Sequence, residues 1–128
     1  MVPTVEWKNG AVRLLDQSRL PEHVEFLDCR DYRAVADAIR ELKVRGAPAI
    51  GVTAALGVAL GAQSVSATEF PAFTRALLPI CDHLAATRPT AVNLFWAIDR
   101  MKKKLTSLSA QSVPAVKAAL LIEAQAIL

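Results

Sequence analysis

Aromatic and charged residues are scarce in this sequence. Only 5% of its 128 residues are aromatic and 21% are charged, and the formal net charge is +3. No basic stretch is interleaved with aromatic side chains, as it would be in many nucleic-acid-binding proteins. We therefore expect no nucleic-acid partner.

Cysteine is scarce too, since Cys29 and Cys81 are the only two. Their separation follows no disulfide pattern, which favours reduced thiols in a cytoplasmic protein. Neither Cys81 nor His83 has a neighbour at metal-ligand spacing, so we expect no metal and no cofactor. Glu6 and Lys8 interrupt any apolar stretch at the N-terminus, which argues against a signal peptide.

A hydrophobic run long enough to cross a membrane is also missing. The apolar stretch at residues 47–62 is shorter than the ~20 residues that a membrane span needs. Yet the chain is 53% hydrophobic, with a mean hydropathy of +0.31. We therefore expect no membrane partner. We do expect large apolar faces that must be buried against other parts of a protein.

The first 30 residues are predicted to form three short antiparallel strands. Asn9-Gly10 separates two apolar or alternating segments, 4–7 and 11–15, which is a strong hairpin signal. A third strand is expected at 24–28, after a polar connector. Together these strands would form a small sheet.

Residues 31–128 are predicted to form a helical bundle in the same domain. The expected helices are 31–43, 48–61, 69–86, 89–106 and 114–128. Asp31 is expected to cap the first helix. Helix 48–61 is apolar on all sides, which places it at the centre of the bundle. Pro79 predicts a kink or break in the third helix near Leu78. The expected fold class is α+β, mostly helical.

The last expected helix is apolar and reaches Leu128 without a Gly, Asn or polar stop signal. We therefore expect the chain to end inside a helix and to be the N-terminal part of a longer protein. The high hydrophobic content agrees, because further chain would cover apolar faces.

Residues 44–51, Val-Arg-Gly-Ala-Pro-Ala-Ile-Gly, hold the first candidate site. Pro48 is expected at the start of a helix, where its missing N–H costs nothing. Arg45, Gly46 and Ala47 would then form the turn before it. Free N–H groups at a helix start attract anions, and an arginine adds a charge-assisted fork. This pattern indicates a phosphate-binding turn, although an ordinary buried helix with a loop arginine would give the same residues.

Residues 87–96 repeat the arrangement of an arginine followed by a proline at an expected helix start. Arg88 precedes Pro89, so its backbone should be extended and it should lie at the mouth of the helix. Asn93, on the first turn, could hydrogen-bond a ligand. Two helix starts that each carry an arginine favour a sugar phosphate, which needs several converging donors. The lysines at 102–104 are expected to cap and solvate the end of this helix.

Three segments in order carry a resemblance to a known family. They are Leu-Leu-Asp-Gln-x-x-Leu-Pro at 14–21, the segment 44–51, and Thr-Arg-Pro-Thr-Ala-Val-Asn-Leu at 87–94. They closely resemble the N-terminal region of the methylthioribose-1-phosphate isomerase family, and they span nearly the whole chain. That family converts 5-methylthioribose 1-phosphate to 5-methylthioribulose 1-phosphate in methionine salvage.

The resemblance implies that Arg45, Gly46, Ala47 and Arg88 bind the sugar phosphate. It places the catalytic cysteine and the aspartate proton donor in a later Rossmann-like C-terminal domain, which is absent from these 128 residues. No catalytic residue is therefore expected in this chain, which is predicted to be inactive alone. A homodimer is implied for the full-length protein.

Two alternatives remain open on the sequence alone. The family's relatives include ribose-1,5-bisphosphate isomerase and regulatory subunits of a translation-initiation guanine-nucleotide exchange factor. A regulatory or interaction subunit would use the same scaffold without catalysis. A helical packing module without a ligand site is the other alternative.

Overall fold

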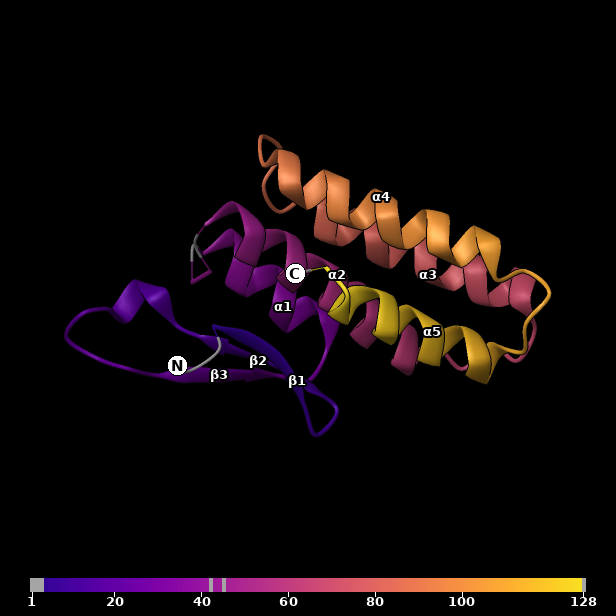
Figure 1. Cartoon of the computed structure of the whole chain (residues 1–128), viewed down its shortest axis with the longest axis horizontal. Helices are drawn as coiled ribbons and strands as arrows, with labels where there is room; N and C mark the ends of the chain where they lie inside the picture. The colour runs from indigo at the N-terminus through magenta and orange to yellow at the C-terminus, as the bar shows by residue number, and fades with distance from the viewer. Residues whose placement is uncertain (1–3, 42, 45, 128) are drawn as a thin grey trace.

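The computed structural model describes residues 4–41, 43, 44 and 46–127, apart from the side chain of Ala47. These residues form five helices and a three-stranded antiparallel sheet, as the sequence predicts. The sheet lies beside one end of the helical bundle (Figure 1).

The sheet has the order β1-β2-β3, with β1 at Val5–Lys8, β2 at Ala11–Leu15 and β3 at Phe26–Cys29. The turn between β1 and β2 places Asn9 at φ 53° and Gly10 at φ 75°. A type I′ hairpin requires positive φ at both central residues, which is why Asn-Gly predicts it correctly. A short 3-10 helix, η1 at Gln17–Arg19, follows β2.

Helix α1 spans Tyr32–Arg40 and is capped as predicted, because the Asp31 carboxylate accepts a hydrogen bond from the Ala34 N–H at 2.8 Å. It ends earlier than the predicted Lys43. Glu41 leaves the helical conformation, and the Lys43 N–H instead bonds the Ala38 carbonyl at 3.0 Å.

Helix α2, at Ala47–Ser64, is the central element. Every residue from Ile50 to Ala62 is buried, and α2 contacts the other four helices as well as β1 and β2. The prediction that this apolar helix lies at the centre is therefore confirmed.

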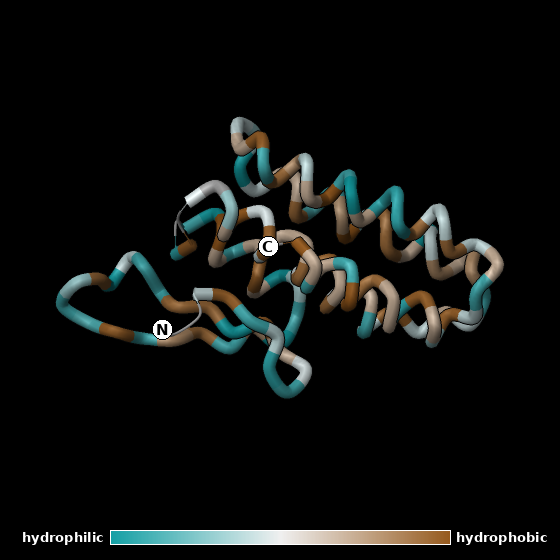
Figure 2. The backbone as a smooth tube through the Cα atoms, viewed as in Figure 1, coloured by the Kyte–Doolittle hydropathy of each residue, from teal (hydrophilic) through white to brown (hydrophobic). Residues whose placement is uncertain are grey.

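The remaining helices pack around α2. They are α3 at Phe70–Ala85, α4 at Val92–Ser107 and α5 at Val113–Gln125. Figure 2 shows hydrophilic and hydrophobic segments alternating along α4, since one side of this helix packs inward and the other does not. No helix among the described residues combines the length and apolar character that crossing a membrane requires.

Other predictions also differ from the structure, among them the start of β3, at Phe26 rather than 24, and the end of α2, at Ser64 rather than 61. Helix α3 continues through Pro79 without the break that the proline suggested. Helix α4 begins at Val92 rather than Pro89, because a turn comes first. Helix α5 ends at Gln125, where Ala126 caps it, and the predicted end at Leu128 lies outside the described residues.

Candidate functional site

The first backbone N–H groups of α2 are not capped by a side chain. Gly46 is the N-cap residue, with φ 89° and ψ 132°, a conformation that glycine adopts far more readily than other residues. Pro48 follows in the first turn, as predicted, and the Ile50 N–H makes a helical hydrogen bond to the Gly46 carbonyl at 3.0 Å. No side chain caps this turn and no acidic residue lies in it. The helix start is therefore free to receive an anion.

The start of α4 lies at the same end of the bundle. A Cβ added to Gly51 of α2 would lie 3.3 Å from the Asn93 carbonyl oxygen and 3.7 Å from the Ala97 Cβ of α4. The second turn of α2 therefore packs against the first two turns of α4, and the two helices run in the same direction (Figure 1). Helix α4 also begins without a side-chain cap and without an acidic residue in its first turn. The positive dipole ends of α2 and α4 thus reinforce each other.

Helices α1 and α5 differ from α2 and α4, because a side chain caps each of their starts. The Asp31 carboxylate caps α1, and the Ser112 hydroxyl accepts from the Ala115 N–H at the start of α5. Helix α3 also starts uncapped, at Glu69, but its start lies at the opposite end of the bundle from those of α2 and α4 (Figure 1). Among the described helices, two uncapped starts lie together only at the end of the bundle where α2 and α4 begin.

Arg88 lies between α3 and α4. It follows the buried Thr87, whose hydroxyl donates to the Leu84 carbonyl at 2.7 Å, and its own carbonyl accepts from the Ala91 N–H at 3.0 Å. Its side chain is half-buried. It makes no hydrogen bond or ion pair with any residue in the described part of the chain. A guanidinium in this position is available for a ligand.

The predicted position of Arg88 needs one correction. Because Pro89 occupies a turn and α4 begins three residues later, Arg88 lies one turn before the helix rather than at its mouth. Asn93 is on the first turn of α4, as predicted, and is half-buried.

The structure brings the backbone of Gly46 and Ala47 to the same end as the start of α4. Arg45 lies outside the described residues. The convergence of Arg45 and Arg88 on one ligand therefore stays a prediction.

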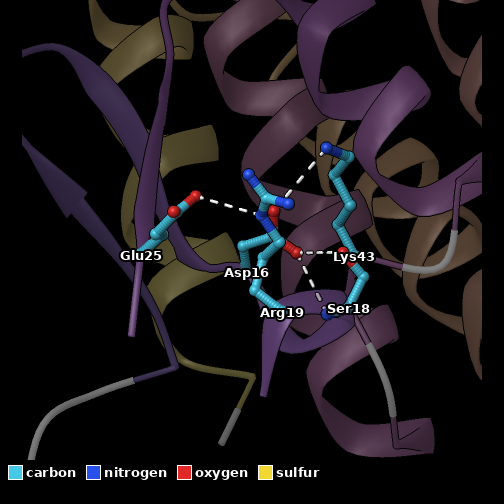
Figure 3. A network of polar contacts seen from close by, with 5 residues as sticks. All are labelled: Asp16, Ser18, Arg19, Glu25 and Lys43. Carbon is cyan, nitrogen blue, oxygen red and sulfur yellow. Dashed lines mark hydrogen bonds and ion pairs between the residues drawn. The ribbon is translucent and has the colours of Figure 1, made fainter. Parts of the chain in front are cut away.

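Sequence reasoning missed a polar cluster beside this end, formed by Asp16, Ser18 and Lys43 (Figure 3). The Asp16 side chain is only 2% exposed. One of its carboxylate oxygens accepts from the N–H and the hydroxyl of Ser18, and the other lies 3.6 Å from the Lys43 Nζ. Two signals pointed to Asp16: its place in the segment 14–21 that carries the family resemblance, and the tendency of aspartate side chains to bond the backbone two residues later.

The electrostatics of Asp16 follow from these contacts. Burial raises the pKa of Asp16, but the hydrogen bonds from Ser18 and the positive charge of Lys43 outweigh burial, so the pKa lies below its ordinary value. Asp16 is therefore a carboxylate, paired with Lys43, over the whole neutral range.

A hollow of about 520 Å³ lies between α4 and α5. Its lining residues are Trp96, Asp99, Arg100, Lys103, Lys104 and Glu123. The Arg100 guanidinium is 2.6 Å from the Glu123 carboxylate and 5.6 Å from the centre of the Trp96 ring. Two of its cations are paired with carboxylates, Arg100 with Glu123 and Lys103 with Asp99.

Both cysteines are free and buried. Burial raises the pKa of the Cys29 and Cys81 thiols to about 11 each, with nearby aspartates adding to the effect at Cys29. Neither thiol is activated as a nucleophile, which requires a lowered pKa. The described residues contain no group of three or more side chains suited to hold a metal ion.

Comparison with known proteins connects the geometry to a family. Residues 43–128 match the Initiation factor 2 subunit family. Methylthioribose-1-phosphate isomerase from Syntrophotalea carbinolica is 55% identical over 98% of this chain, and the match covers 37% of that protein. The isomerase of the same name from Trichlorobacter lovleyi is 51% identical over 94% of this chain and is covered to 35%. The chain thus spans little more than a third of these relatives.

Two solved structures share the fold closely. The 5-methylthioribose 1-phosphate isomerase from Pyrococcus horikoshii OT3 superposes with a TM-score of 0.94 at 38% identity. The delta subunit of translation initiation factor eIF-2B from A. fulgidus gives a TM-score of 0.90 at 39% identity. Each match covers 99% of this chain and 36% of the other chain.

Proposed function

Because the chain belongs to the Initiation factor 2 subunit family, we propose that it is the substrate-binding N-terminal part of an aldose–ketose isomerase. The substrate is 5-methylthioribose 1-phosphate and the product is 5-methylthioribulose 1-phosphate. The observation that carries the proposal is the close packing of Gly51 against Asn93, which brings two uncapped helix starts to one end of the bundle. A phosphate needs such converging N–H donors together with cations.

The proposed binding residues are Arg45, Gly46, Ala47 and Arg88. The backbone N–H of Ala47 would donate to a phosphate oxygen, and Gly46 lets the ligand approach the main chain because it has no side chain. Arg88 is half-buried and without a protein partner in the described part of the chain, so its guanidinium would supply a bidentate contact.

Isomerisation itself needs groups that this site lacks. Moving hydrogen between C1 and C2 of the sugar requires a positioned acid and base. The first turns of α2 and α4 contain no acidic residue, and the two buried thiols have raised pKa values. The chemistry would belong to the remainder of a full-length protein, for which we propose a homodimer. We expect this chain alone to bind but not to turn over the substrate.

A regulatory subunit is the second candidate, and one observation favours it. The eIF-2B delta subunit, at 39% identity and a TM-score of 0.90, is nearly as similar to this chain as the solved isomerase, at 38% and 0.94. The relatives with about half of their matched residues identical favour the isomerase. The two functions differ in whether the sugar phosphate binds.

Calorimetric titration of this chain with 5-methylthioribose 1-phosphate tests the proposal. A charge-assisted hydrogen bond is worth about 1.5–3 kcal/mol, so Arg88→Ala should weaken binding by on the order of ten- to a hundredfold. Arg88→Lys should recover only part, because lysine keeps the charge but not the planar fork. Arg75→Ala, which removes an exposed arginine of α3, is the matched control and should bind normally.

Two outcomes would contradict the proposal. Absence of binding by the unaltered chain would favour the regulatory candidate. Equal loss of affinity in Arg88→Ala and Arg75→Ala would show that only net charge matters.

A further inference from the structure

The buried carboxylate of Asp16 has a position that the binding proposal does not explain. It lies at the end of β2, and its side chain is 2% exposed. Buried carboxylates are rare unless they are paired, because loss of hydration disfavours the charge. Asp16 is paired on both oxygens, to Ser18 on one side and to Lys43 on the other (Figure 3).

The residues next to Asp16 are held firmly by the sheet. The Leu15 N–H donates to the Thr4 carbonyl at 2.9 Å, and the Asp16 N–H donates to the Glu25 carbonyl at 2.8 Å. This segment is therefore tied to the strands on both of its sides. Residues that bind to this segment are therefore held in place relative to the sheet.

Asp16 and Gln17 each contact Lys43. The Asp16 carboxylate pairs with the Lys43 ammonium, and the Gln17 N–H donates to the Lys43 carbonyl at 3.0 Å. The Lys43 N–H is in turn bonded to the Ala38 carbonyl at the end of α1. These contacts therefore hold Lys43, which stands three residues before Gly46, the N-cap of α2.

We infer that Asp16 is a positioning residue for the start of α2, where the proposed phosphate site lies, and that it acts through the Lys43 side chain. This inference rests on the proposed function. By fixing Lys43, three residues earlier, Asp16 helps to place Gly46, whose positive φ sets the direction of the first N–H groups of α2. Preorganised donors bind an anion without the cost of ordering them first.

The charge of Asp16 has a second consequence. The Asp16 carboxylate pairs with the Lys43 ammonium, which is 30% exposed and close to the proposed anion site in sequence. If Lys43 acted only by attracting phosphate through its charge, that attraction would be stronger without Asp16, because the lysine would then be unpaired. Positioning and simple charge attraction therefore predict opposite effects when Asp16 is neutralised.

The experiment is an NMR titration of the ¹⁵N-labelled chain with 5-methylthioribose 1-phosphate and, separately, with inorganic phosphate, following the Gly46 amide. The variants are Asp16→Asn, Lys43→Gln and the double substitution. Asn keeps the shape of Asp16 and an acceptor oxygen for Ser18 but removes the charge. Glu25→Gln is the control, because it removes the exposed Arg19–Glu25 ion pair of the same loop.

We expect Asp16→Asn to weaken binding on the order of tenfold, because small displacements of binding groups have effects of this size or larger. Lys43→Gln should cause a similar loss, and the double variant should lose no more than either single one, since both act through one contact. The Gly46 amide signal should shift or broaden in the Asp16 variant before any ligand is added. Glu25→Gln should match the unaltered chain.

Three results would overturn the inference. Unchanged or tighter binding by Asp16→Asn would do so and would leave the proposed function intact. A lower melting temperature with unchanged affinity and an unchanged Gly46 signal would reduce Asp16 to a structural role. Failure of the unaltered chain to bind either ligand would overturn the proposed function and this inference with it.

Discussion

Replacing Gly61 by alanine tests how tightly the central helix is packed. A Cβ at Gly61 would lie 2.6 Å from the Ile80 Cγ2 of α3 and 3.2 Å from its Cδ1. The Cγ2 atom is attached directly to the branched Cβ of Ile80, so it cannot move away without a change of χ1 or of the backbone. The extra methyl group must therefore push α2 and α3 apart.

Two opposing effects set the magnitude. Alanine is about 1 kcal/mol better than glycine inside a helix. Overpacking of a close-packed core costs about 1–3 kcal/mol. We expect Gly61→Ala to lower the free energy of unfolding by roughly 0–2 kcal/mol, where an uncrowded helical site would raise it by about 1 kcal/mol.

Urea unfolding followed by circular dichroism measures this effect in four proteins: the unaltered chain, Gly61→Ala, Ile80→Ala and the double variant. In the Ile80→Ala background the obstructing atom is gone, so Gly61→Ala should become stabilising by about 1 kcal/mol. The reversal of sign is the diagnostic result. Stabilisation by Gly61→Ala in the unaltered background would refute the reasoning.

Four further outcomes are expected. Gly46→Ala should destabilise the start of α2 by about 1–3 kcal/mol, read from urea unfolding, because alanine is strained at φ 89°. Native Cys29 and Cys81 should resist alkylation at pH 8 and react only after denaturation, as mass spectrometry would show, since burial raises both pKa values to about 11. The folded pKa of Asp16 is lowered, so its stabilising contribution should be present above its unfolded pKa of about 3.9 and be lost as the pH falls through the folded value. The gap in stability between the unaltered chain and Asp16→Asn should shrink accordingly in acid titrations. Trp96 is 54% exposed and Val92, four residues earlier on α4, is 76% exposed, so sedimentation should show self-association that Trp96→Gln reduces.

The parts of the fold that sequence predicted well depend on local chemistry. Asn9-Gly10 favours positive φ at two successive residues, which few turns other than a type I′ hairpin use. Asp31 offers a carboxylate at the right distance from the third N–H of α1. In both cases a few neighbouring residues determine the conformation.

The error at Pro89 has the opposite origin. A proline with φ near −65° suits the first position of a helix and also the second position of a turn, so its presence alone does not separate the two. The Ala91 N–H bonds the Arg88 carbonyl, which closes a turn before α4 begins at Val92. Pro79 does not break α3, although a proline inside a helix removes a hydrogen bond, and Leu77 and Ile80 on either side of it are buried.

The candidate site was predictable only in part. The segments that carry it were found because arginine, glycine and proline form a recognisable order. The packing of Gly51 against Asn93 and the pairing of Asp16 with Lys43 join residues distant in sequence. Periodicity and turn signals report on neighbours along the chain, so they contain no information about these contacts.

Because α2 is buried on all sides, we expect the domain to unfold as a single cooperative unit. The amides between Ile50 and Ala62 lie in a helix with no face open to solvent, and the other four helices all contact it. Removing any one of those helices would uncover α2, so its amides should exchange with solvent hydrogen only when the whole bundle opens. A ligand bound at the start of α2 would therefore slow exchange throughout the domain, because it favours the folded state as a whole.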